Sequence, residues 1–286
     1  MMYCDDKDCV KTTLPTLGKN TLEFKNFKNT QRHSFIIFAD FECFTKPLDF
    51  NETDITIKYQ KHEPSGFCFY VKCSEKNVYD KEPILYTKQY EDDDVPKKLV
   101  ECLENALREI DELYENPKKM IYGKEERTKY RNTSQCYICQ KTFNFEDKKL
   151  IKVRDHCHLT GRYRGAAHSK CNLDIKTPNF VPVVFHNLEG YDSHLFIRNL
   201  GVSEGEIDCI PKNEEKFISF TKNVVVGGYI DEDGEIKERY KKLRFIDSLK
   251  FMNSGLTKLV DNLDKETKVK VTNKFYDGRS LDLLLR

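Results

Sequence analysis

The sequence predicts an α/β protein that carries an inserted zinc-binding module. Two Cys/His pairs with the spacing of zinc ligands enclose a short basic segment. An apolar run typical of a buried strand stands on each side of this segment, and a long amphipathic helix precedes it. The ligand pairs indicate a compact metal module, and strands that alternate with helices indicate a layered α/β domain around it.

Composition and charge distribution support a globular protein with a basic region. At 286 residues, with 38% hydrophobic and 12% aromatic residues, the chain is long enough for one large domain or two smaller ones. The segment Pro117–Pro178 holds 15 Lys and Arg against 6 Asp and Glu, a net +9, whereas the remainder carries −8. This segment favours binding to phosphate groups, and a solvated basic surface is the alternative.

The chain has eleven cysteines but neither an N-terminal signal region nor a long apolar run. This pattern favours a reducing intracellular compartment, the nucleus or cytoplasm, over secretion. We therefore expect neither disulfides nor a membrane span. Cys4 and Cys9 lie in an N-terminal extension, residues 1–33, and are either the remainder of a zinc finger or two unrelated thiols.

The first predicted strand, Ser34–Phe44, begins with a continuous apolar run and carries Asp40 and Glu42 near its end. Because they are two residues apart on a strand, both carboxylates project from the same face. Desolvated carboxylates repel each other unless a cation neutralises them, so the pair predicts a metal site. Solvation of the strand end is the alternative.

The next predicted elements complete the first part of the main domain, residues 34–116. Strands at Gly66–Cys73 and Ile84–Tyr86 complete a meander. The segment Val95–Glu115 predicts a helix, because its Val, Leu and Ile residues recur on one stripe. The Asn-Pro pair that follows ends this helix.

The metal module is predicted at residues 117–178. Cys136 and Cys139 have a two-residue spacing that lets a tight turn aim both sulfurs at one zinc. His168 and Cys171 repeat the spacing about thirty residues later. The four side chains predict a tetrahedral structural zinc site. Ordinary buried thiols with a surface histidine are the alternative.

A second set of side chains lies between and directly after these pairs. Asp155 and Asn172 offer hard oxygen ligands that suit Mg²⁺. His156 can take a proton from a water that attacks phosphorus. Zinc would hold the hairpin and helix that present these groups. We also expect Arg162 and Arg164 to bind nucleic acid.

The pattern C-x-I-C-Q, D-H-x-H, R-G and C-N in this segment resembles the HNH nucleases and, among them, the phage recombination endonuclease VII group. The resemblance covers about forty residues and implies a ββα-metal module. It implies structural Zn²⁺ at the two ligand pairs, catalytic Mg²⁺ or Mn²⁺ at Asp155 and Asn172, and His156 as the general base.

Two positions depart from that group. His168 stands where the group usually has Cys, a change that zinc tolerates. Ile175 stands where an acidic residue is expected, with Asp174 one place early. The second departure weakens the expectation of cleavage more than that of the fold.

After the module, Asn179–Leu188 predicts a strand whose proline indicates a bulge or an early strand position. A helix is predicted from about Tyr191. Asn187 stands at the end of this strand. Asp192 stands at the start of the helix, where it either caps the helix or serves a metal site.

In the C-terminal part, strands are predicted at Ile207–Lys222 and Val224–Tyr229, followed by a hairpin turn at Asp231–Gly234. The segment Lys241–Asn253 then leads to a helix with one apolar side. The apolar residues of that side are Leu256, Leu259, Val260 and Leu263.

Together, the strand with D-x-E, the meander, the helix and the strand with H-N-x-x-G-Y-D resemble the 3′–5′ exonuclease domain of family B DNA polymerases, which has a ribonuclease H-like fold. With an S/T-L-x-x-apolar element at Ser248 and Leu249, the pattern is similar to protein-primed polymerases of Polinton/Maverick-type elements, viruses and linear plasmids. This resemblance implies that Asp40, Glu42 and Asp192 hold two divalent ions that activate water.

The same resemblance implies nucleic-acid contacts. Asn187 would contact a single-stranded primer end, and Ser248 and Leu249 would contact single-stranded DNA and a terminal priming protein. The module would interrupt the exonuclease domain, whose second part is residues 179–286. The third exonuclease motif, Y-x-x-x-D, and the palm motifs are not found before Arg286. We therefore expect the N-terminal part of a polymerase, with no DNA extension and little exonuclease activity.

Three functions follow as hypotheses. The first is a polymerase fragment with an incomplete exonuclease domain and an HNH module that binds and nicks DNA. The second is a free-standing Mg²⁺-dependent HNH endonuclease acting on duplex or branched DNA. The third is a non-catalytic DNA-binding remnant of a mobile element. A nick lost in His156→Ala but not in Asp40→Ala separates the first two, and salt-sensitive binding without turnover indicates the third.

Overall fold

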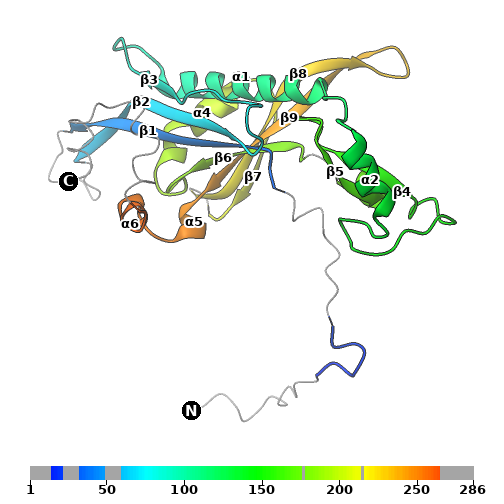
Figure 1. The fold of residues 1–286 in the computed structure, drawn as a ribbon. Helices are drawn as coiled ribbons and strands as arrows, with labels where there is room; N and C mark the ends of the chain where they lie inside the picture. The colour runs from blue at the N-terminus through cyan, green and yellow to red at the C-terminus, as the bar shows by residue number, and fades with distance from the viewer. Residues whose placement is uncertain (1–13, 22–31, 49–58, 176–177, 214–215, 265–286) are drawn as a thin grey trace, which may run out of the picture. The chain divides into compact units, whose positions relative to one another are not determined.

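The computed structural model describes residues 14–21, 32–48, 59–175, 178–213 and 216–264 (Figure 1). Cys4 and Cys9 lie outside the described residues. The chain divides into two compact units. The first contains residues 1–31, 128–155 and 165–176, and the second contains 32–127, 156–164 and 177–286.

The elements follow in the order strand meander, two helices, hairpin, helix, strand, helix, three strands and two short helices. Their bounds are β1 (Phe35–Pro47), β2 (Gln60–Cys73), β3 (Ile84–Thr87), α1 (Val95–Glu115), α2 (Lys124–Asn132), β4 (Lys152–His156), β5 (Tyr163–His168), α3 (Ser169–Asp174), β6 (Phe180–Phe185), α4 (Asp192–Val202), β7 (Ile207–Pro211), β8 (Phe217–Ile230), β9 (Ile236–Asp247), α5 (Leu249–Met252) and α6 (Leu256–Asp261). None of the helices in these described ranges is long and apolar enough to cross a membrane.

The second unit is built on a seven-stranded mixed sheet with the order β3-β2-β1-β6-β9-β8-β7. The meander β1–β3 is antiparallel. The central pairs β1/β6 and β6/β9 are parallel. Two further antiparallel pairs, β9/β8 and β8/β7, complete the sheet on the other side. The predicted α/β class is confirmed by this arrangement.

The helix predicted at Val95–Glu115 is confirmed as α1. Its start is stabilised by Asp94, whose side chain accepts a hydrogen bond from the Lys97 backbone N–H at 3.0 Å. Its apolar stripe is fully buried at Leu99, Leu103 and Ile110. Because α1 contacts α4 as well as β2, β8 and β9, the two helices α1 and α4 contribute to one core (Figure 1).

Aromatic side chains fill this core. The Phe196 ring of α4 contacts three strands: its centroid lies 5.7 Å from that of Phe41 on β1, 5.4 Å from that of Phe185 on β6 and 5.4 Å from that of Phe245 on β9. The Phe245 ring stacks on Phe220 of β8 at 4.8 Å. These contacts join the two central parallel pairs to α4, and so position the loop that precedes α4.

β1 is buried on one face, which differs from the prediction of a continuous buried run. Phe35, Ile37, Ala39 and Phe41 are buried, whereas side chains between them are partly or fully exposed. The two-residue period of a strand produces this alternation. The apolar run Ser34–Phe44 therefore predicted the strand correctly, but it did not show that one face of the strand is buried and the other exposed.

The bounds of the two C-terminal strands predicted at Ile207–Lys222 and Val224–Tyr229 need correction. The first strand, β7, ends at Pro211, and the second, β8, begins at Phe217 and continues to Ile230. Pro211 has no backbone N–H for a ladder, which favours this end. The predicted turn before β9 is confirmed by the Asp231 N–H to Glu235 carbonyl hydrogen bond at 2.9 Å.

The helix predicted after Lys241–Asn253 is present as α6, but its apolar side is not buried. Leu256, Val260 and Leu263 are 47%, 44% and 45% exposed. The period-3.6 pattern therefore predicted the helix, and burial within the described residues did not follow from it.

Candidate metal centre and carboxylate sites

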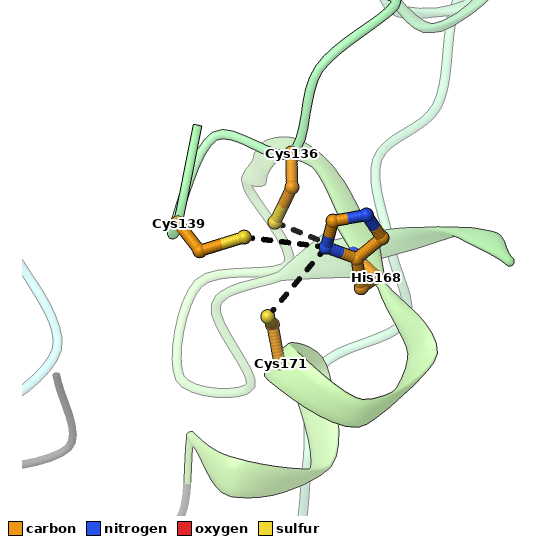
Figure 2. Close-up of side chains that lie close together, drawn as sticks. All are labelled: Cys136, Cys139, His168 and Cys171. Carbon is orange, nitrogen blue, oxygen red and sulfur yellow. Dashed lines mark hydrogen bonds between the residues drawn. The ribbon is translucent and has the colours of Figure 1, made fainter. Parts of the chain in front are cut away.

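The four predicted zinc ligands come together in the first unit. Their donor atoms, the Sγ of Cys136, Cys139 and Cys171 and a ring nitrogen of His168, all lie within 4.8 Å of one another (Figure 2). Within the described ranges, this is the one group of three or more Cys, His, Asp or Glu side chains that is compact enough to hold a metal. The predicted assembly of these four residues is confirmed.

Local backbone structure aims the first pair of sulfurs. The Gln140 N–H donates to the Cys136 carbonyl at 2.8 Å, and the Cys136 N–H donates to the Lys141 carbonyl at 2.9 Å. Gln140 has φ +60, a left-handed conformation that reverses the chain directly after Cys139. The two-residue spacing of Cys136 and Cys139 thus forms a tight knuckle. The second pair comes from the end of β5 and the first turn of α3.

The orientation of the His168 ring fits a metal ligand. The Nδ1 atom of His168 faces the Sγ atoms of Cys139 and Cys171 at 3.3 and 3.7 Å (Figure 2). Its Nε2 atom lies 3.0 Å from the Thr142 carbonyl oxygen. A ring N–H that donates to a backbone carbonyl leaves the other nitrogen with a free lone pair, the usual state of a metal-bound imidazole.

Electrostatics of the cluster also favour a cation. Burial raises the pKa of the Cys171 thiol to about 12, together with a hydrogen bond to Cys139 and the charges of Cys136 and Cys139. Burial alone would raise the pKa of Cys136, but backbone N–H groups of Cys139, His168 and Ile138 lower it overall. Three thiols and an imidazole this close fit Zn²⁺, which neutralises the thiolates.

The second predicted set is placed as follows. Asp155 lies on β4 and is 6% exposed, and its Oδ2 atom accepts a hydrogen bond from the Tyr137 hydroxyl. Asn172 lies half-buried on α3 in the same unit. His156 belongs to the second unit, where its ring centroid is 4.9 Å from that of His158.

The two predicted DNA-binding arginines have protein partners. The Arg162 guanidinium donates to both carboxylate oxygens of Glu75, at 3.0 and 3.2 Å, although its side chain is 64% exposed. Arg164 is exposed. Burial raises the pKa of the Cys157 thiol, but hydrogen bonds from Thr160 and then from the Arg164 side chain lower this pKa overall. Both cations remain accessible, but the ion pair of Arg162 would compete with a phosphate.

In the second unit, the carboxyl ends of the parallel strands meet at one edge of the sheet. Asp40 is near the end of the core part of β1, and Asp247 ends β9. Phe185 of β6 pairs with Asp247, so the residues after β6 emerge beside it. Ligands of open α/β sheets bind at such an edge.

The predicted carboxylates differ in burial. Asp40 and Glu42 are both exposed on one face of β1, as the two-residue spacing predicted, and a bulge follows directly after Glu42. Asp192 at the start of α4 is 2% exposed. Among the described residues, Asp40, Glu42 and Asp192 do not form a compact metal-holding group as the zinc ligands do.

Asp192 nevertheless has the electrostatics of a cation site. Burial and, next, the charge of Asp40 raise its pKa to about 7; the backbone amides of Asp192 and Phe41 oppose this rise, and the charge of Asp247 adds to it. The Oδ1 atom of Asp192 is buried without a hydrogen-bond partner. Partial burial and then the charge of Glu42 raise the pKa of Asp40 as well. A buried carboxyl oxygen that lacks a donor fits a bound cation.

The predicted nucleic-acid residues lie around this edge. Asn187 is exposed, with φ +71. Ser248 is 7% exposed, and its Oγ atom donates to the Phe185 carbonyl and lies 3.0 Å from His186 Nδ1. The Leu249 side chain is partly buried. Ser248 is thus tied into the protein, whereas Asn187 is accessible.

Sequence reasoning missed Asp247 and Tyr137. Asp247 is 3% exposed and accepts three backbone hydrogen bonds, from Asn187, Glu189 and Leu249. An acid at the end of an apolar run, the signal that identified Asp40, also marks Asp247 in the sequence. No sequence signal identifies Tyr137, because its partner Asp155 is 18 residues away.

Comparison with known proteins identifies one segment. Residues 112–183 match the family model described as recombination endonuclease VII. No curated protein and no solved structure matches the chain. The matched segment is about a quarter of the chain and includes the whole Cys₃His cluster, Asp155, His156 and Asn172. Residues 112–183 of the chain therefore form an endonuclease VII-like domain.

Proposed function

We propose that this protein is a Mg²⁺-dependent endonuclease that nicks DNA through its endonuclease VII domain, with Zn²⁺ in a structural role. The observation that carries the proposal is the match over residues 112–183 together with the Cys₃His cluster inside it. The net charge of +9 over Pro117–Pro178 supports a phosphate backbone as the ligand.

The proposed roles of the side chains follow from their chemistry. Asp155 and Asn172 supply a carboxylate and an amide oxygen, which are ligands that Mg²⁺ accepts. His156 takes a proton from the attacking water at a ring nitrogen. A bound Mg²⁺ supplies Lewis acidity for the phosphoryl oxygen and charge stabilisation for the leaving oxygen. The Cys₃His residues hold the knuckle and α3, and do not contact the reacting atoms.

The test is an incubation of the zinc-loaded chain with end-labelled single-stranded, duplex and branched DNA in Mg²⁺ or Mn²⁺. We expect internal cuts that His156→Ala lowers by at least about a hundredfold, in the range of a lost general base. His194→Ala is the matched control, because His194 is an exposed histidine on α4. Equal cutting by wild type and His156→Ala would refute the assignment of His156.

A second function is proposed for the second unit, because Asp192 has a buried oxygen without a donor. We propose that Asp40, Glu42 and Asp192 bind divalent cations at the 3′ end of single-stranded DNA, as in the exonuclease region of a protein-primed family B polymerase with a ribonuclease H-like fold. The support is the order of meander, helix, parallel strand and helix, with the acids at one sheet edge.

Asn187, Ser248 and Leu249 would then line the path of the single strand, and a terminal priming protein would be a partner in the polymerase. We expect Mn²⁺-dependent binding of single-stranded 3′ ends that Asp40→Ala and Asp192→Ala weaken and His156→Ala does not. Rapid 3′–5′ degradation would contradict the expected low exonuclease activity. If none of Asp40→Ala, Asp192→Ala and His156→Ala changes DNA binding, this result would favour the non-catalytic DNA-binding function.

A further inference from the structure

Tyr137 connects the zinc knuckle to the proposed Mg²⁺ ligand Asp155. It lies between two zinc ligands, Cys136 and Cys139, so the knuckle determines the position of its backbone. Its N–H donates to the Ala166 carbonyl of β5 at 3.0 Å. Its hydroxyl donates to Asp155 Oδ2. One residue therefore joins the cluster, β5 and the Asp155 carboxylate within the first unit.

Gly165 makes room for the Tyr137 ring. A Cβ atom at position 165 would lie 2.8 Å from the ring Cδ1 atom and 2.9 Å from Cγ. Such distances are shorter than van der Waals contact, so a side chain at position 165 would displace the ring. The close approach of the ring to the β5 backbone thus requires a residue without Cβ at this position.

We infer that Tyr137 is a positioning residue that holds the Asp155 carboxylate in the orientation that binds the divalent cation. The inference rests on the proposed endonuclease function. Asp155 is 6% exposed, and a phenolic hydroxyl directed at Oδ2 restricts the rotation of the carboxylate. Partners of metal-binding carboxylates act in this way, and their loss typically weakens metal binding ten- to a hundredfold.

The position of Tyr137 makes this orientation dependent on the zinc cluster. Cys136 and Cys139 flank Tyr137, and the Cys136 Sγ atom accepts a hydrogen bond from the His168 N–H at 3.3 Å. A knuckle that is held by zinc keeps the Tyr137 backbone fixed beside β5, and the hydroxyl transmits that position to Asp155. The zinc would thereby affect Mg²⁺ or Mn²⁺ binding without contacting DNA.

The test measures Mn²⁺ binding to the full, zinc-loaded chain by electron paramagnetic resonance of free Mn²⁺, together with DNA nicking and zinc content. The Mn²⁺ that Asp155→Asn removes defines the site. We expect Tyr137→Phe to weaken binding at this site by about ten- to a hundredfold, with unchanged zinc content. Tyr130→Phe is the matched control, since its hydroxyl donates to the Lys152 carbonyl in the same unit at 3.0 Å.

Gly165→Ala is the second variant, because it displaces the ring and retains the hydroxyl. We expect the same loss of Mn²⁺ affinity with zinc retained. If Tyr137→Phe and Gly165→Ala both bind Mn²⁺ as tightly as the wild type, the inference is overturned. DNA nicking by the wild type would in that case still support the endonuclease proposal. Weaker Mn²⁺ binding in Tyr137→Phe, in a chain that never nicks DNA, would uphold the inference and overturn the endonuclease proposal. Absence of Asp155-dependent Mn²⁺ binding in the wild type would overturn the inference.

Discussion

The Asp247 carboxylate accepts a hydrogen bond from the backbone N–H of Asn187 at 2.9 Å, although the two residues are 60 positions apart. Asp247 ends β9, and Asn187 lies in the loop between β6 and α4. The same carboxylate accepts the Glu189 N–H at 3.1 Å. One buried acid thus holds the loop that leads to Asp192, and this role differs from direct metal binding.

Asp247→Ala is therefore expected to destabilise the protein by about 2–4 kcal/mol, because three backbone N–H groups lose a charged, buried acceptor. The measurement is urea unfolding followed by circular dichroism. Asp208→Ala is the control, since Asp208 is 66% exposed and forms a surface ion pair with Lys242 at 3.4 Å; such pairs contribute roughly 0–1 kcal/mol. Equal effects of both substitutions would contradict this role of Asp247.

Zinc removal is expected to unfold the first unit and leave the sheet of the second intact. The Cys₃His cluster fixes the knuckle and α3, whereas α1 and the central strands have their own aromatic core. Cys139→Ser should reduce bound zinc well below about one ion per chain and remove amide-exchange protection near Cys136. Cys209→Ser, at an exposed thiol, should change neither. Loss of protection in α1 as well would contradict this independence.

The raised pKa of Asp192 predicts that stability falls with rising pH when no divalent ion is added. Its folded-state pKa is about 7, above the ordinary 3.8. The folded state therefore binds more protons, and its advantage is complete below the ordinary value and is lost as the pH rises through about 7. The expected loss is on the order of 4–5 kcal/mol, because the shift is about three pKa units at about 1.4 kcal/mol per unit.

Asp192→Asn should flatten this pH dependence in unfolding experiments between pH 4 and 8, because the amide does not ionise. Asp233→Asn, in the exposed turn between β8 and β9, should retain the wild-type slope. Added Mn²⁺ should stabilise the wild type more at pH 8 than at pH 5, since the cation binds the ionised carboxylate. Identical slopes for wild type and Asp192→Asn would contradict the assignment.

Lys222→Met is expected to destabilise the protein by about 2–4 kcal/mol. Lys222 is 0% exposed, and its Nζ atom donates to the carbonyls of Leu200, Ser203 and Gly205 at 2.8, 2.6 and 2.9 Å. The ammonium group satisfies carbonyls at the C-terminal end of α4, where a cation also interacts favourably with the helix dipole.

Thermal unfolding of Lys222→Met beside Lys242→Met measures this effect, because Lys242 makes a partly exposed ion pair with Asp208. A Lys222→Met protein as stable as the wild type would show that apolar burial of the methionine offsets the lost hydrogen bonds. In that case, the hydrogen bonds of Lys222 would not be what stabilises the C-terminal end of α4.

Features that depend on local spacing were predictable. The tight turn between Cys136 and Cys139, and the amphipathic stripe of Val95–Glu115, follow from residues close in sequence. The division of Ile207–Lys222 into β7 and β8 was not predicted, although the polar residues 212–216 separate the two strands. The parallel pairing of β6 with β1 and with β9 joins residues that lie far apart in the sequence. Strand partners need tertiary contacts that periodicity does not encode.

The candidate zinc ligands, the basic segment and the carboxylates at the ends of apolar runs could be identified from the sequence, because residue type and spacing are enough to define them. Which polar groups contact one another depends on the tertiary structure. Asp247 holds the loop at Asn187, and Tyr137 contacts Asp155, through hydrogen bonds between different elements. Such contacts depend on strand register and on the close approach allowed at Gly165, which arise when the whole unit packs.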